Sequence, residues 1–79
     1  MTRTLSTITI NPVFGLILNV RAKPVDIILN DRVLVVIMET GTPYDIFGIN
    51  PGGDIPYGAE YITTHSINGS TYSFYRRSA

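Results

Sequence analysis

The chain has 79 residues, enough for one small domain and too few for a second core. It contains no cysteine and a single histidine, His65, which excludes disulfide bridges and a structural zinc site built from the usual ligands. Six basic residues balance six acidic ones, and only 15% of residues are charged, so no general field attracts nucleic acid or an anionic membrane.

Strand signals dominate the N-terminal third. Arg3–Ile10 reads as a threonine-rich strand that ends at Asn11-Pro12, and the range 1–12 is a candidate arm that adds to a neighbouring sheet edge. Gly15–Ala22 is a second predicted strand. Pro24 indicates a strand start or an edge position, because proline cannot donate to the ladder. With no signal-peptide core and no apolar run long enough for a membrane helix, we expect a soluble protein of unknown location.

A hairpin is predicted next. The segments Val25–Leu29 and Val33–Glu39 flank three polar residues. A two-residue turn at Asn30-Asp31 fits, because both residue types tolerate a positive φ. That turn pairs Leu29 with Arg32, Ile27 with Leu34 and Val25 with Val36, while Ile28 faces Val33 and Asp26 faces Val35 on the opposite side.

The strand Val33–Met38 is apolar at every position, so both of its faces need cover. If its outward side chains stay exposed, each forgoes about 1.5–3 kcal/mol of burial, against a total stability of about 5–15 kcal/mol. Cover from another molecule is the favoured interpretation. The alternative is that the following glycine- and proline-rich range, 40–58, folds back over this face.

The range 40–58 is predicted to be a long loop, apart from a candidate short strand at Tyr44–Ile49. Its aromatic and branched side chains argue against disorder, so we expect an ordered loop that packs on something. Whether it binds a partner or covers the core is left open by the sequence. The residues we expect to contact a partner are Val33, Val35, Ile37, Tyr44, Phe47, Ile49, Ile55 and Tyr57.

The last predicted element is a hairpin, Glu60–Ile67 and Ser70–Arg77, around the strong turn signal Asn68-Gly69. We expect the more apolar of its two faces to look inward, and we expect Arg76 to lie over Tyr61 as a cation–π pair. The predicted inward pairs are Ile67 with Ser70, His65 with Tyr72, Thr63 with Phe74 and Tyr61 with Arg76. The outward pairs include Ile62 with Tyr75 and Glu60 with Arg77.

Signals for chemistry are weak. His65 has no second catalytic group near it in sequence, and we interpret it as a strand histidine stacked on Tyr72. The carboxylates Asp45, Asp54 and Glu60 match no calcium loop. Aromatic and basic residues do alternate from Tyr72 to Arg77, as in single-strand nucleic-acid binders, but the neutral net charge favours core aromatics followed by a solvated basic end.

These patterns predict an all-β, single-domain barrel or sandwich of five to seven mostly antiparallel strands. We expect a non-enzymatic structural or assembly protein that acts through protein contacts, with itself or with a larger protein assembly, and with no cofactor or metal. One setting for such a module is a phage or virus particle, since the chain resembles decoration or cement proteins in size and β character alone, which is no family match. The alternatives are an inhibitor or adaptor that binds one partner, a small nucleic-acid-binding barrel and, last, an enzyme.

Overall fold

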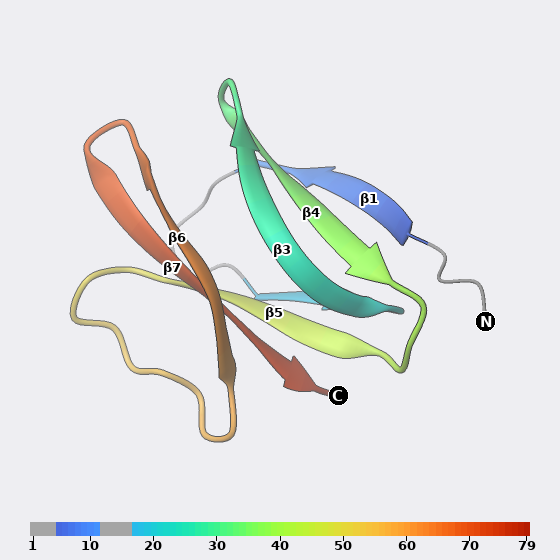
Figure 1. The fold of residues 1–79 in the computed structure, drawn as a ribbon. Helices are drawn as coiled ribbons and strands as arrows, with labels where there is room; N and C mark the ends of the chain where they lie inside the picture. The colour runs from blue at the N-terminus through green and yellow to red at the C-terminus, as the bar shows by residue number, and fades with distance from the viewer. Residues whose placement is uncertain (1–4, 12–16) are drawn as a thin grey trace.

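Residues 5–11 and 17–79 are described by the structure, a computed structural model, and they form seven β-strands in two antiparallel sheets (Figure 1). The all-β prediction is confirmed, and no helix that could span a bilayer occurs among these residues. Four residues of the predicted strands, Arg3-Thr4 and Gly15-Leu16, lie outside the described ranges. The strands are β1 (Leu5–Ile10), β2 (Ile17–Val20), β3 (Lys23–Asn30), β4 (Val33–Glu39), β5 (Tyr44–Ile49), β6 (Glu60–Ile67) and β7 (Ser70–Ser78).

The two sheets pack face to face as a sandwich. One has the strand order β1-β4-β3 and the other β2-β5-β7-β6. The sheets come together at one side, where β3 lies against β6, and the barrel is not closed on the side of β1 and β2 (Figure 1). A sandwich of seven antiparallel strands is therefore the form that the predicted fold takes.

The core lies between the sheets and follows from strand alternation. Leu34, Val36 and Met38 are buried along β4 because successive side chains of a strand point to opposite faces. From the other sheet, Ile46 and Phe74 are almost fully covered. The remaining members of the buried cluster are Val20, Ile27, Ile67 and Tyr72.

The hairpin of β3 and β4 is confirmed, but its predicted register is wrong by two residues. The turn residues are Asp31 and Arg32, and Asp31 takes the positive φ of 60°. Leu29 consequently lies opposite Leu34 and not Arg32. The shift leaves the side chains of residues 26–29 and 33–36 on their predicted faces, because the period of a strand is two. Val25 is the exception: it lies at the register shift between Pro24 and Asp26 and does not pair with Val36. The observed pairs are Asn30 with Val33, Leu29 with Leu34, Ile28 with Val35, Ile27 with Val36 and Asp26 with Ile37.

The turn of the C-terminal hairpin is confirmed at Asn68-Gly69, where φ is 50° and 80°. The predicted pairs hold from Ile67 opposite Ser70 to Thr63 opposite Phe74. A bulge between Tyr61 and Thr63 then shifts the register. The predicted pairs beyond it are wrong: Tyr61 lies opposite Tyr75, Glu60 lies opposite Arg76, and Ile62 packs against the core.

The bulge also removes the predicted contact between Arg76 and Tyr61. Tyr61 makes an edge-to-face contact with Tyr75, with the ring centroids 5.6 Å apart. A cation–π contact occurs instead between Arg77 and Phe47, with the guanidinium carbon 5.1 Å from the ring centroid.

β5, the candidate strand Tyr44–Ile49, divides the range 40–58 into a connection at 40–43 and a loop that continues one residue further, over 50–59. β5 pairs with β2 and β7, so the loop begins and ends on the four-stranded sheet. Arg77 Nη1 donates to the carbonyl oxygen of Tyr57 at 3.2 Å and ties the loop to that sheet. The alternative that this range covers the outward side of Val33–Met38 is therefore wrong.

Candidate functional site

The outward side of the three-stranded sheet carries a row of apolar side chains, which we call the outer apolar face: Leu5, Ile28, Val33, Val35 and Ile37. The register places them together. Ile28 lies directly opposite Val35 on one side, while Leu5 lies opposite Glu39 at the end of β1. Directly paired residues of an antiparallel ladder share a face, so these side chains point away from the core.

The burial of the outer apolar face is only partial. Leu5 is 61% exposed and Ile28 is 42% exposed, whereas the three residues of β4 are half-buried between their neighbours on β1 and β3. No other described strand packs on this face, since the sheets contact each other through β3 against β6 and β5. Covering the exposed part of Leu5 or of Ile28 is worth about 1 kcal/mol each.

Polar side chains surround the outer apolar face. Thr7 and Thr9 of β1 lie opposite Ile37 and Val35. On the other flank Asp26 lies opposite Ile37, and its carboxylate accepts a hydrogen bond from the backbone N–H of Ile27 at 2.8 Å. An apolar centre with a polar rim is the usual anatomy of a protein–protein interface.

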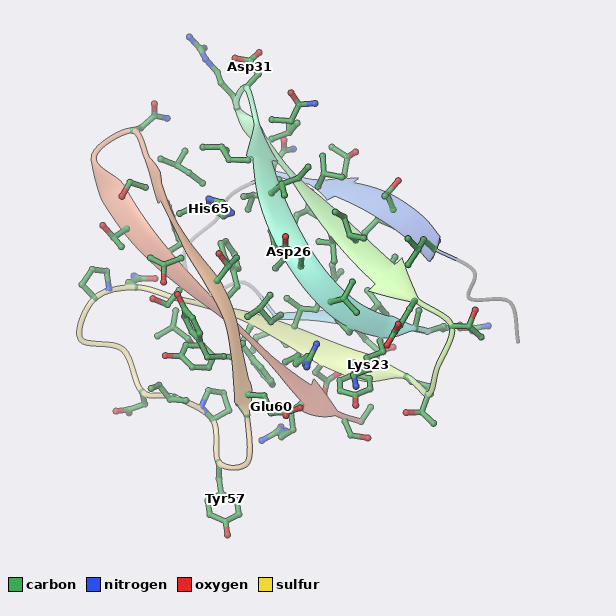
Figure 2. All side chains as sticks on the ribbon, in the orientation of Figure 1. Lys23, Asp26, Asp31, Tyr57, Glu60 and His65 are labelled. Carbon is green, nitrogen blue, oxygen red and sulfur yellow. The ribbon has the colours of Figure 1, made fainter. Side chains whose placement is uncertain are left out.

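The other predicted interaction residues lie elsewhere. Tyr44 packs against the core, and Phe47 is buried beneath Arg77. Ile49 is half-buried at the end of β5. In the loop 50–59, Ile55 is 55% exposed and Tyr57 is 96% exposed, and Figure 2 shows the Tyr57 ring pointing away from the rest of the chain. The predicted residues thus fall into two separate groups, one on the outward side of β4 and the other on β5 and the loop 50–59.

Two members of the outer apolar face, Leu5 and Ile28, were not among the predicted interaction residues. A signal existed for Ile28, because either hairpin register places it beside the apolar outward residues of β4. Leu5 gives no such signal, since it is a single leucine within the threonine-rich predicted strand Arg3–Ile10. Its position depends on the pairing of β1 with β4, which connects residues more than 30 positions apart.

The side of the sandwich where β3 meets β6 is joined by two side chains. His65 Nε2 lies 2.5 Å from the carbonyl oxygen of Ile27, and Arg76 Nη1 donates to the carbonyl oxygen of Pro24. Figure 2 shows His65 on β6 facing β3. The two side chains therefore occupy backbone acceptors on the free edge of β3. His65 lies opposite Tyr72, as predicted, but its ring contacts Phe74 at 6.2 Å between centroids.

The candidate catalytic and metal-binding carboxylates are separated. Asp45 accepts a hydrogen bond from Asn19 at 2.9 Å, and Glu60 lies 3.5 Å from Arg76 Nε. Asp54 lies in the loop 50–59, in the lining of an open recess that it shares with Ile49 and Asn50. Within residues 5–11 and 17–79, no three histidine or carboxylate side chains gather as a metal-binding group.

The aromatic and basic residues of β7 do not form one surface. Tyr72 and Phe74 are buried in the core, while Tyr75 points outward against Tyr61. Arg76 points inward to β3, and Arg77 lies over Phe47 on the outward side. Both cations thus make contacts within the chain.

A groove of about 360 Å³ opens between β1 and β2, on the unclosed side of the sandwich. Its lining is mainly apolar and includes Ile8, Leu18, Val20 and Met38 together with the polar side chains of Asn19 and Arg21. Apolar side chains next to the core, such as Ile8 of β1 and Leu18 of β2, therefore line an open groove.

Comparisons with known protein families, curated proteins and solved structures gave no match to this chain. The functional argument therefore depends on the geometry described above.

Proposed function

We propose that this chain is a non-enzymatic structural or assembly module that acts through protein–protein contacts, with the outer apolar face as its principal contact surface. The observation that carries the proposal is the exposure of Leu5 and Ile28 beside the half-buried residues of β4. An exposed apolar surface with polar residues around it is typical of an interaction site.

The composition supports the same function. A net charge of zero and a charged fraction of 15% give little repulsion between copies. A chain of 79 residues also gains a large share of its stability from each extra apolar contact. Low repulsion between copies and stability gained from apolar contacts both favour a symmetric or repeating assembly, such as a particle in which a decoration protein covers a larger shell.

His65 has a structural role in this proposal. Its Nε2 lies 2.5 Å from the carbonyl oxygen of Ile27 on the other sheet, and its ring packs near Phe74. In the proposal His65 holds the two sheets together.

The test is Val35→Lys, which places a charge at the centre of the outer apolar face. The matched control is Ser66→Lys, which adds the same charge on the outward side of β6, where Ser66 is exposed. Light scattering on the purified chain across a range of concentrations should show an assembly that Val35→Lys dissociates and Ser66→Lys preserves.

Circular dichroism on both variants separates dissociation from unfolding. A wild-type chain that stays monomeric at all concentrations would contradict the proposal in its self-assembling form. Such a monomer would favour an inhibitor or adaptor with one foreign partner.

A further inference from the structure

The two edges of the three-stranded sheet are treated differently by the chain. On β3, the carbonyl oxygens of Pro24 and Ile27 accept hydrogen bonds from Arg76 and His65. On β1, the described residues make ladder contacts with β4 only, and no described side chain bonds to the far edge. Figure 1 shows β1 at the outside of its sheet, next to β4. As far as residues 5–11 and 17–79 show, the edge of β3 is capped and the edge of β1 is bare.

The sequences of the two edge strands also differ: β3 contains residues that prevent edge pairing, and β1 does not. β3 carries Lys23, Pro24, Asp26 and a register shift between Pro24 and Asp26, which are the devices that proteins use to prevent edge pairing. β1 reads Leu-Ser-Thr-Ile-Thr-Ile and pairs with β4 without a bulge. It has no charge, no proline and high β propensity. β1 is therefore suited to accept another strand.

We propose that β1 pairs antiparallel with β1 of a second copy, around a two-fold axis normal to the sheet. This inference rests on the proposed assembly function and names the partner of one contact. A second copy is the occupant favoured by the strand itself, because an uncharged edge meets its own copy without repulsion. β1 also offers no charge by which it could select a foreign strand.

The pleat restricts the register of this pairing. Outward side chains must meet outward side chains, so the two-fold axis lies midway between a residue and the same residue of the second copy. Registers in which residue i faces residue i+1 of the second copy are excluded. Two registers overlap most. In the first, Thr7 faces Thr7 of the second copy and residues 5–9 pair. In the second, Ile8 faces Ile8, Thr7 faces Thr9, and residues 6–10 pair. Cross-strand threonine pairs are favourable.

The pairing also affects the groove between β1 and β2 and the outer apolar face. The groove between β1 and β2 has Ile8 in its lining, and the partner's Ile8 or Ser6 lies beside it in either register. The outer apolar faces of the two copies then lie on the same side of one six-stranded sheet. The dimer presents a doubled apolar surface to the next component of the assembly.

The test is disulfide cross-linking in the full-length chain, which has no cysteine of its own. The variants are Thr7→Cys and Thr9→Cys on exposed positions of β1, with Ser66→Cys on β6 as the matched control. Directly opposed residues of an antiparallel pair have Cα atoms about 4.5–5.5 Å apart, within the range of about 4.4–6.8 Å that a disulfide needs. Residues displaced from the axis lie farther apart and do not cross-link.

The first register predicts that Thr7→Cys alone forms a covalent dimer on a non-reducing gel. The second predicts that the dimer forms when Thr7→Cys and Thr9→Cys are mixed. In both registers, Thr9→Cys alone stays at the level of Ser66→Cys. For whichever register occurs, we expect the yield of covalent dimer to be severalfold above that of Ser66→Cys.

The pairing is overturned if neither Thr7→Cys nor the mixture exceeds the control, or if every variant cross-links equally. If this happens while Val35→Lys still dissociates an assembly, the edge pairing fails and the proposed function stands. If the wild-type chain shows no assembly by light scattering, the proposed self-assembly fails with it. The two failures are therefore distinct.

Discussion

Arg76 provides the sharpest test of how the two sheets are held together. Its side chain is 19% exposed and donates to the carbonyl oxygen of Pro24 on β3, while its Nε lies 3.5 Å from the carboxylate of Glu60. Arg76→Met keeps the aliphatic stem in place and removes the donors. The carbonyl of Pro24 is then left without this partner.

The magnitude follows from the two contacts. A hydrogen bond from a charged donor contributes about 1.5–3 kcal/mol. The ion pair contributes about 0–1 kcal/mol, because Glu60 is 64% exposed and its charge is screened by water. We therefore expect Arg76→Met to lower the free energy of unfolding by about 2 kcal/mol, and Glu60→Gln to lower it by well under 1 kcal/mol.

The assay is thermal unfolding followed by circular dichroism. A loss of about 2 kcal/mol lowers the Tm of a domain this size by roughly 8–16 °C. All variants must be compared at one protein concentration, because self-association raises the Tm by mass action. If Arg76→Met melts with the wild type, or if Glu60→Gln costs as much, the hydrogen bond to β3 does not join the sheets as described.

Three further predictions test the core, a turn and the loop. Leu34 is fully buried, so Leu34→Ala should lower the free energy of unfolding by about 2–5 kcal/mol in a urea titration, and a loss below 1 kcal/mol would contradict the burial. Gly69 has a φ of +80°, so Gly69→Ala should cost about 1 kcal/mol or more by the same measurement, and an unchanged midpoint would argue against this turn. Arg77→Ala should speed proteolysis within the loop 50–59, because Arg77 Nη1 donates a hydrogen bond to the carbonyl oxygen of Tyr57. Arg32→Ala, on the exposed turn of the β3–β4 hairpin, is the control that should leave the rate of cleavage unchanged. Equal rates in both variants would show that this hydrogen bond does not hold the loop in place.

Local chemistry made the strands predictable. Alternating β-branched residues and the Asn68-Gly69 turn are properties of neighbouring residues, and they identify β6, β7 and their register as far as Thr63. The turn before β4 was harder. Asn30, Asp31 and Arg32 are three consecutive polar residues, and the sequence does not say which two of them form the turn.

The bulge near Ile62 and the placement of the loop depend on the fold. Ile62 packs against the core, and the shifted register brings Glu60 opposite Arg76. Neither contact is visible from the hairpin alone. The separation of the predicted interaction residues has the same origin, because the pairing of β5 with β2 and β7 takes Phe47 and Ile49 to the other sheet.

The position of β7 has a consequence for the order of folding. β7 lies between β5 and β6, which therefore run parallel to each other and are joined by the loop 50–59 that passes from one side of β7 to the other. The β6–β7 hairpin can form locally, whereas its docking on β5 must close a loop between distant residues, the slower kind of step. Until docking occurs, β5 and β7 each present an unpaired backbone. During refolding at high concentration, that interval is when misassembly competes with the native sheet.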